Sequence, residues 1–132
     1  MQEAEDIVRA FYDALAKGDL DRGLGLLDPQ VRWLEAERTP SYTGQLVGRD
    51  AVVETVLGPV SKAFENFAVT ASEYVTQGDR TAAFGEYTGR HLGGGQLRAP
   101  FVHLWDVHDG VITSFRQYTD SAVWTAAMAG AS

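Results

Sequence analysis

The chain contains no cysteine, and this absence excludes several kinds of chemistry at once. Without thiols there is no disulfide scaffold, no thiolate metal site and no cysteine nucleophile. The sequence also lacks an uninterrupted apolar run of the roughly 18–20 residues that would span a bilayer. The N-terminus is acidic at Glu3, Glu5 and Asp6, whereas a secretory signal is basic and then apolar. We therefore expect a cytoplasmic protein without a membrane partner.

Positive charge is scarce as well. Eleven Lys and Arg residues stand against 18 Asp and Glu residues, which gives a formal net charge of −7. This balance argues against nucleic acid or an anionic membrane surface as the main partner. The 132 residues fit a single domain over residues 1–132 that buries enough surface to fold without covalent cross-links.

Aromatic residues, in contrast, are plentiful. The chain has six Phe, five Tyr and three Trp, but only two Met. Rings in this number indicate an aromatic core or a cavity lined with rings.

Hydrophobic periodicity in the first half of the chain predicts three helices. Residues 3–16 carry one apolar stripe with a helical period, and Gly18 is a natural stop after it. Asp19 can cap a second, short helix, and Asp50 can cap a third. Gly58-Pro59 should break or kink the third helix, with a helical remnant that continues to Phe67.

The hydrophobic period changes to two in the second half, which predicts strands. We expect strands at about 68–76, 81–91, 97–108 and 111–119, in addition to a short strand at 31–35. The Asp109-Gly110 dipeptide is a strong signal for a two-residue hairpin turn. The predicted fold class is α+β: three N-terminal helices pack in the concave face of a strongly curved, mostly antiparallel sheet. Such a cone-shaped barrel has an internal pocket that suits a small molecule.

The predicted hairpin also predicts which side chains share a face. If two residues join the strands, Val107 pairs with Ile112 and His103 pairs with Arg116. One face then carries Phe101, His103, Trp105, Arg116 and Tyr118. Asp120, two residues after Tyr118, falls on the same face, and Gln117 lies on the other face. In a flat sheet His103 and Asp120 would be ~13 Å apart at ~3.3 Å per residue, so contact between them needs curvature or a bulge.

Two residues of that face have acid–base potential, and each has a structural alternative. His103 is either a general acid or base near neutral pH or a hydrogen-bonded core histidine. Asp120 is either a base, with its pKa raised if it is enclosed beside rings, or the cap of a helix over residues 121–129.

Other polar residues also have two interpretations. Glu35, in phase with Trp33, is either a base in the cavity or a partner for Arg38 at its mouth. Arg116 either anchors an anionic substrate group or neutralises Asp120 or Glu35. The tyrosines are either hydrogen-bond donors to a ligand or packing residues, and these are Tyr12, Tyr42, Tyr87 and Tyr118.

Metal and nucleophile motifs are missing from the sequence. His91, His103 and His108 do not have the spacing of metal ligands, because they lie in different strands or out of phase. There is no Ser-His-Asp signature, and Gly93-Gly94-Gly95 does not follow a strand and open a helix, as a phosphate loop would.

Several stretches of the chain resemble one family. They are Phe11-Tyr12, Lys17-Gly18-Asp19-Leu20-Asp21, Gly48-Arg49-Asp50-Ala51-Val52, Phe101-Val102-His103-Leu104-Trp105, Asp109-Gly110-Val111-Ile112 and Arg116-Gln117-Tyr118-Thr119-Asp120. They are similar to the SnoaL-like polyketide cyclases and ketosteroid-isomerase-like proteins of the nuclear-transport-factor-2-like superfamily. The resemblance extends over essentially the whole chain.

This resemblance implies a cone-shaped α+β barrel, a homodimer, and acid–base chemistry without a metal or an organic cofactor. His103 and Asp120 match the cyclase pair, in which the aspartate is the general acid or base and the histidine assists it. In the steroid-isomerase pattern the base falls on Glu35, but the two enolate hydrogen-bond donors fall on Phe11 and Val102. Both donors are therefore absent, which disfavours the standard ketosteroid isomerisation.

We therefore predict a cofactor-independent cyclase or isomerase that acts on a small hydrophobic carbonyl metabolite. The predicted catalytic residues are Asp120, His103 and Glu35. The predicted substrate-binding residues are Trp33, Tyr12, Tyr42, Phe101, Trp105, Arg116 and Tyr118, and no metal site is predicted. The alternatives are a non-catalytic ligand-binding domain of the same fold, or a cofactor-independent epoxide hydrolase in which Glu35, Arg116 and Asp120 hold a water.

Overall fold

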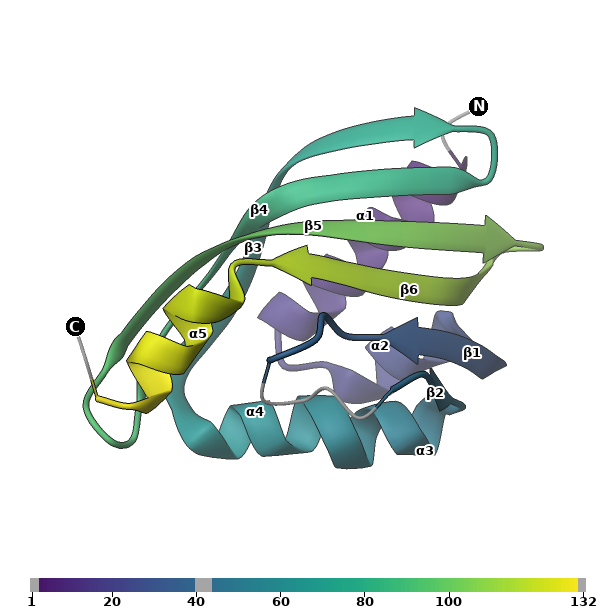
Figure 1. Ribbon diagram of the computed structural model, residues 1–132. Coiled ribbons are helices and arrows are strands. Elements are labelled where there is room, and N and C mark those ends of the chain that lie inside the picture. Colours follow the sequence, from purple (N-terminus) through teal and green to yellow (C-terminus); the bar gives the residue numbers. More distant parts are fainter. Residues whose placement is uncertain (1–2, 40–43, 131–132) are drawn as a thin grey trace.

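A curled, unclosed sheet of six strands forms the body of the protein in the computed structural model, which describes residues 3–39 and 44–130 (Figure 1). The strands are β1 (Leu27–Leu34), β2 (Leu46–Val47), β3 (Phe64–Gln77), β4 (Arg80–His91), β5 (Gln96–His108) and β6 (Val111–Thr119). Their order is β2-β1-β6-β5-β4-β3. Among the strands of the described residues only β1 and β6 pair in parallel, so the sheet is mostly antiparallel, as predicted.

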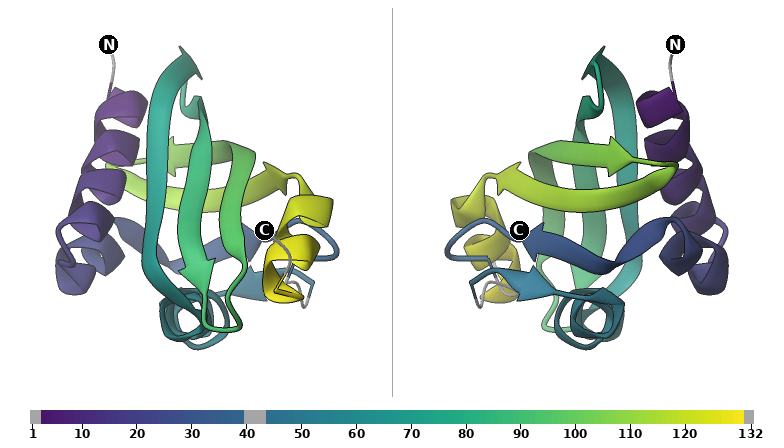
Figure 2. Two further views of the ribbon diagram at one scale, coloured as in Figure 1. Left: turned by 90° about the vertical axis from the view of Figure 1, so that its left-hand side faces the viewer. Right: turned by 90° about the vertical axis from the view of Figure 1, so that its right-hand side faces the viewer.

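Helices cover the concave face and one end of this sheet. They are α1 (Glu3–Ala16), α2 (Leu20–Gly25), α3 (Arg49–Val52), the π-helical turn η1 (Val53–Leu57), α4 (Gly58–Ala63) and α5 (Ser121–Met128). In Figure 2 the segment formed by α3, η1 and α4 is seen end-on, and α1 and α5 lie on opposite sides of the molecule. The α+β class and the three N-terminal helical segments are as predicted, and α5 is the helix that Asp120 caps in one of its two interpretations.

At Gly58-Pro59, where the sequence predicts a break or a kink, the helix continues through a wider turn. The chain remains helical from α3 through η1 into α4, and Pro59 stands at the start of α4. Proline has no N–H to donate, and a π turn accommodates this within a continuing helix. The expected helical remnant to Phe67 is wrong, since the helix ends at Ala63 and β3 begins at Phe64.

Bulges give the sheet its curvature. The register between β3 and β4 shifts between Glu65 and Ala68 and again between Ala71 and Glu73. Opposite the second shift, a Cβ atom on Gly85 would lie 1.9 Å from the carbonyl oxygen of Thr70. Bulges bend and twist a strand pair, and only a glycine permits so close an approach of two backbones.

The concave face holds two groups of apolar side chains. The larger group joins α1 to β1, β5 and β6 and includes Phe11, Trp33 and Trp105. The smaller group lies under α5 and includes Phe101 and Trp124. Among the described residues, no helix has both the length and the apolar character needed to cross a membrane.

Candidate active site

A row of buried polar side chains runs through the concave face of the sheet. Glu35 follows the end of β1, Tyr87 comes from β4, His103 from β5 and Gln117 from β6, while Tyr12 reaches in from α1. Each of the five is at most 7% exposed. Buried polar groups are costly unless they are paired, and every buried side-chain nitrogen or oxygen in the described part of the chain has a partner.

The imidazole of His103 lies at the centre of this row, between two tyrosine hydroxyls. Its Nδ1 atom is 2.5 Å from the hydroxyl of Tyr12, and its Nε2 atom is 2.5 Å from the hydroxyl of Tyr87. The ring also stacks on Phe101, with centroids 3.8 Å apart and planes 9° apart. Burial lowers the pKa of His103 well below its usual value, so the ring is neutral near pH 7.

Donors at both ends of the row restrict where the protons can be. The indole N–H of Trp105 donates to the Tyr12 hydroxyl over 3.0 Å, and the amide of Gln117 donates to the Tyr87 hydroxyl over 2.7 Å. A neutral imidazole donates from one nitrogen and accepts at the other. It therefore donates to one tyrosine and accepts from the other. The tyrosine that accepts from the imidazole also accepts from Trp105 or Gln117. Its own hydroxyl proton is therefore free to be donated to a further acceptor.

The carboxyl group of Glu35 lies at the Gln117 end of the row. The indole N–H of Trp33 donates to Glu35 Oε2 over 2.8 Å. Burial raises the pKa of Glu35 to about 7, although hydrogen bonds from Trp33 and Gln117 oppose the shift. A carboxyl group with this pKa is present in both protonation states near neutral pH, which suits a general acid or base. The structure thus places Glu35 in the concave face, one of the two positions considered for it.

The strand pairing beyond Val107 differs from the predicted pairing. Val107 pairs with Ile112 as expected, and Asp109 and Gly110 both have positive φ, as a two-residue hairpin turn requires. A bulge follows, with Thr113 as the extra residue, so that Trp105 lies opposite Phe115 and His103 opposite Gln117. A shift of one residue moves every later side chain to the other face.

Arg116 and Tyr118 consequently lie on the outer face, where both are exposed. The predicted pairing of His103 with Arg116 is wrong, and neither residue lines the interior. Gln117, expected on the other face, takes the inner position. No signal in the sequence marks the extra residue at Thr113.

Asp120 occupies the second position considered for it, that of a helix cap. Its Oδ1 atom accepts from the backbone N–H groups of Ala122 and Val123 at the start of α5, and the residue is exposed. Both ring nitrogens of His103 are already bonded to tyrosines. The structure therefore does not bring the His103–Asp120 pair together, nor the Glu35, Arg116 and Asp120 set of an epoxide hydrolase.

The structure divides the predicted substrate-binding residues into three groups. Trp33, Tyr12, Phe101 and Trp105 are buried in the concave face. Arg116 and Tyr118 lie outside it, and Tyr42 is outside the described residues. From the sequence, Tyr87 was expected only as one of several tyrosines that could donate to a ligand, and Gln117 was not expected in the site. Side chains alternate between the two faces of a strand, and Tyr87 lies four residues after Ala83 on β4, so both point into the concave face. This alternation was the sequence signal that could have placed Tyr87 in the site.

The interior rings pack against one another. Trp33 stacks on Phe115 with centroids 3.9 Å apart, and Phe11 meets Trp105 edge-on at 5.3 Å. Two hollows, of about 520 and 260 Å³, are lined mainly by outward-facing residues of the sheet. Within the described ranges, no group of three or more His, Cys, Asp or Glu residues is arranged to hold a metal ion.

Solved structures with the same arrangement define the class of fold. An NTF2-like protein from Burkholderia thailandensis has a TM-score of 0.91 and 24% identity, covering 97% of this chain and 98% of that chain. A proposed polyketide cyclase from Silicibacter sp. has a TM-score of 0.81 and 19% identity, covering 96% of each chain. TerC, crystallised with polyporic acid, has a TM-score of 0.86 and 24% identity, covering 96% of this chain and 98% of that chain. These similarities establish a nuclear-transport-factor-2-like fold.

The family follows from the sequence match. The model of the SnoaL-like domain matches residues 8–115, and the chain therefore belongs to the SnoaL-like family. No curated protein matches the chain.

Proposed function

We propose that this protein is an acid–base enzyme that isomerises or cyclises a hydrophobic carbonyl compound, with Glu35 as the base. The observation that carries the proposal is the buried carboxyl group of Glu35, whose pKa is raised to about 7. It lies at the end of a hydrogen-bonded row of Gln117, Tyr87, His103 and Tyr12. Aromatic rings surround the row and supply an apolar environment for the substrate.

The proposed first step forms an enolate. The Glu35 carboxylate takes a proton from the carbon next to the carbonyl group, and the C–H electron pair becomes a C=C bond as the carbonyl oxygen gains negative charge. The tyrosine with a free hydroxyl proton, Tyr12 or Tyr87, donates to that oxygen. A positioned donor to a developing oxyanion lowers the barrier.

The second step distinguishes the two reactions. In an isomerisation, protonated Glu35 returns the proton to a different carbon of the enolate. In a cyclisation, the enolate carbon attacks a second carbonyl group of the same molecule, and that oxygen takes the proton from Glu35. Both reactions use only carboxyl and hydroxyl groups of this chain. Asp120 has no part in them, because it caps α5.

One solved structure with the same fold supports an organic compound as the substrate. TerC, the protein in that structure, was co-crystallised with polyporic acid. We also propose that the protein is a single domain over residues 1–132, cytoplasmic and a homodimer, as the sequence and the family resemblance imply. Light scattering after size-exclusion chromatography tests the dimer.

The role of Glu35 is tested with 5-nitrobenzisoxazole, a hydrophobic carbon acid. When a base removes its ring C–H proton, the N–O bond breaks and a coloured phenolate forms. The protein should accelerate this reaction above buffer, with a rate that rises with pH around a midpoint near 7, the pKa of Glu35. Glu35→Gln should lower the rate by about 100-fold or more.

Asp120→Asn is the matched control, because asparagine also caps helices. Its rate should equal that of the wild type. A Glu35→Gln protein that is folded by circular dichroism and keeps the wild-type rate contradicts the proposal, and so does a loss of rate in Asp120→Asn alone.

A non-catalytic ligand-binding domain is the second candidate. It is favoured by one observation, namely that the buried polar atoms of the described residues already satisfy one another. This candidate predicts that 5-nitrobenzisoxazole quenches tryptophan fluorescence in a saturable way without release of phenolate, in both the wild type and Glu35→Gln.

A further inference from the structure

The outer face of the sheet carries a cationic hollow of about 260 Å³. It opens on the side of β1, β4, β5 and β6 opposite to Glu35. The polar side chains of its lining are Arg32, Gln45, Arg80, Asp106, Ser114 and Arg116. Three guanidinium groups and one carboxylate therefore line the same small space, in a chain whose net charge is −7.

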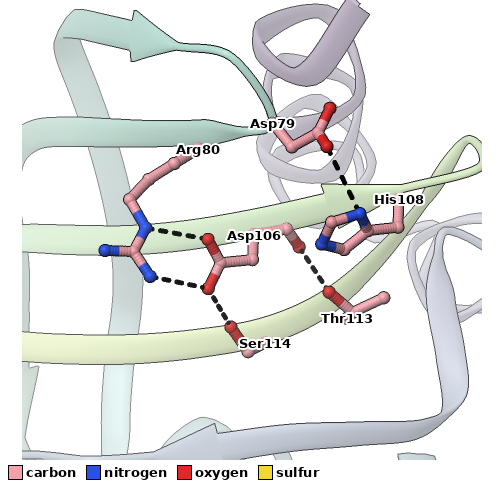
Figure 3. A network of polar contacts seen from close by, with 6 residues as sticks. All are labelled: Asp79, Arg80, Asp106, His108, Thr113 and Ser114. Carbon is pink, nitrogen blue, oxygen red and sulfur yellow. Dashed lines mark hydrogen bonds and ion pairs between the residues drawn. The ribbon is translucent and has the colours of Figure 1, made fainter.

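The single carboxylate in the lining, that of Asp106, is already hydrogen-bonded to neighbouring side chains (Figure 3). Asp106 Oδ1 accepts from Arg80 Nε over 2.8 Å, and Asp106 Oδ2 accepts from a terminal nitrogen of Arg80 over 3.1 Å. The Ser114 hydroxyl donates to the same Oδ2 over 2.6 Å. Together, Arg80 and Ser114 keep the pKa of Asp106 below its usual value, with the bond from Arg80 as the largest cause. This two-bond fork fixes one guanidinium group in place.

The other two guanidinium groups are brought together by the strand register. Arg32 on β1 lies opposite Ser114 on β6, and Leu34 lies opposite Arg116, so that the two arginines are diagonal neighbours on adjacent strands. Neither forms an ion pair with any residue in the described ranges 3–39 and 44–130. Arginine stays charged at all ordinary pH values, so a bound anion would reduce the repulsion between these two like charges.

We propose that this hollow binds a small oxyanion, the phosphate or carboxylate group of a small molecule. Guanidinium groups pair with such groups through two parallel N–H···O bonds, and Arg32 and Arg116 line the hollow without an ion-pair partner among the described residues. One terminal nitrogen of Arg116 donates to the Tyr118 hydroxyl over 3.4 Å, which leaves its other N–H groups for an anion. The Gln45 and Ser114 side chains add neutral polar groups to the lining. This inference is independent of the proposed function, because the hollow is on the opposite face of the sheet from Glu35.

Titrations of ¹⁵N-labelled protein with sodium phosphate and with sodium succinate test the proposal. Each is compared with sodium chloride at the same ionic strength, which keeps general screening constant. We expect saturable shifts of the amide signals of Arg32, Ser114 and Arg116 with at least one of the two anions. Phosphate alone, succinate alone, or both would identify the bound group as phosphate, carboxylate or either oxyanion.

Arg116→Gln and Arg32→Gln should each weaken the binding by about tenfold or more. Arg98→Gln is the matched control, because Arg98 lies on the same sheet and already pairs with Glu86 at 3.6 Å. It should bind as the wild type does, and so should Glu35→Gln. The proposal is overturned if chloride causes the same shifts, if neither anion causes saturable shifts, or if Arg116→Gln and Arg32→Gln bind as tightly as Arg98→Gln.

Discussion

Trp105 on β5 lies opposite Phe115 on β6, one residue beyond the partner that a regular two-residue hairpin would give it. This single displacement decides both faces of the sheet. On the concave face it places Gln117 beside Tyr87, which completes the hydrogen-bonded row around His103. On the outer face it places Arg116 near Arg32, which creates the cationic hollow.

Glu35 should make the stability of the protein fall as pH rises. Its carboxyl group has a pKa of about 7 in the folded state, against 4.5 for a freely exposed glutamate, so the folded state holds the proton more tightly. The free energy of unfolding should therefore decrease between about pH 4.5 and 7 and stay lower above that, by on the order of 3 kcal/mol. Urea denaturation at a series of pH values measures this slope.

Glu35→Gln should remove that slope, because the amide cannot ionise. The exposed neighbour provides the control, and Glu37→Gln should keep the pH dependence of the wild type. If Glu35→Gln and the wild type lose stability in parallel across this range, the buried carboxyl group is not its cause.

The hydroxyl of Tyr87 should contribute more to stability than an exposed tyrosine hydroxyl does. Tyr87→Phe leaves His103 Nε2 and the Gln117 amide without their partner in a buried site. We expect a loss of about 1–3 kcal/mol in the free energy of unfolding. Tyr118→Phe, at a position that is 50% exposed, should change it by less than about 0.5 kcal/mol. Equal effects in chemical denaturation would show that the buried row does not form as described.

Asp120 should act as a helix cap. Asp120→Ala removes the acceptor for the N–H groups of Ala122 and Val123, and should cost about 1 kcal/mol. Asp120→Asn should lose at most a few tenths of that amount, because an asparagine oxygen accepts the same bonds. Thermal denaturation followed by circular dichroism separates the two variants, and equal destabilisation would mean that the charge of Asp120, not its capping bonds, matters.

Two glycines should respond in opposite ways to a methyl group. Gly85→Ala places a Cβ atom 1.9 Å from the Thr70 carbonyl oxygen, so the backbones of β3 and β4 must separate, at a cost of at least about 2 kcal/mol. Gly25→Ala meets no atom within 4 Å, and should be neutral or stabilising by about 0.5 kcal/mol. Denaturation midpoints compare them directly, and a neutral Gly85→Ala would mean that the strands do not approach this closely.

Much of the secondary structure follows from local signals. The apolar stripe of α1, the stop at Gly18 and the Asp109-Gly110 turn are each encoded within a few residues, and all three are observed. The end of α4 and the start of β3 differ from the prediction because Phe64 and Phe67 fit the apolar pattern of either a helix or a strand. Their packing beneath Trp124 of α5, far along the chain, accompanies the extended form.

The sequence by itself determined the α+β class, the aromatic character of the interior and the absence of cysteine chemistry, since no thiol is present at any position. Tertiary structure alone decided which polar residues meet. The bulge at Thr113 exchanges Arg116 for Gln117 inside the sheet, and the capping bonds of Asp120 keep it at the surface. Burial beside Trp33 then raises the pKa of Glu35, because a low-dielectric environment disfavours its charged form. Side-chain period is a local property, whereas register and burial depend on partners distant in the chain.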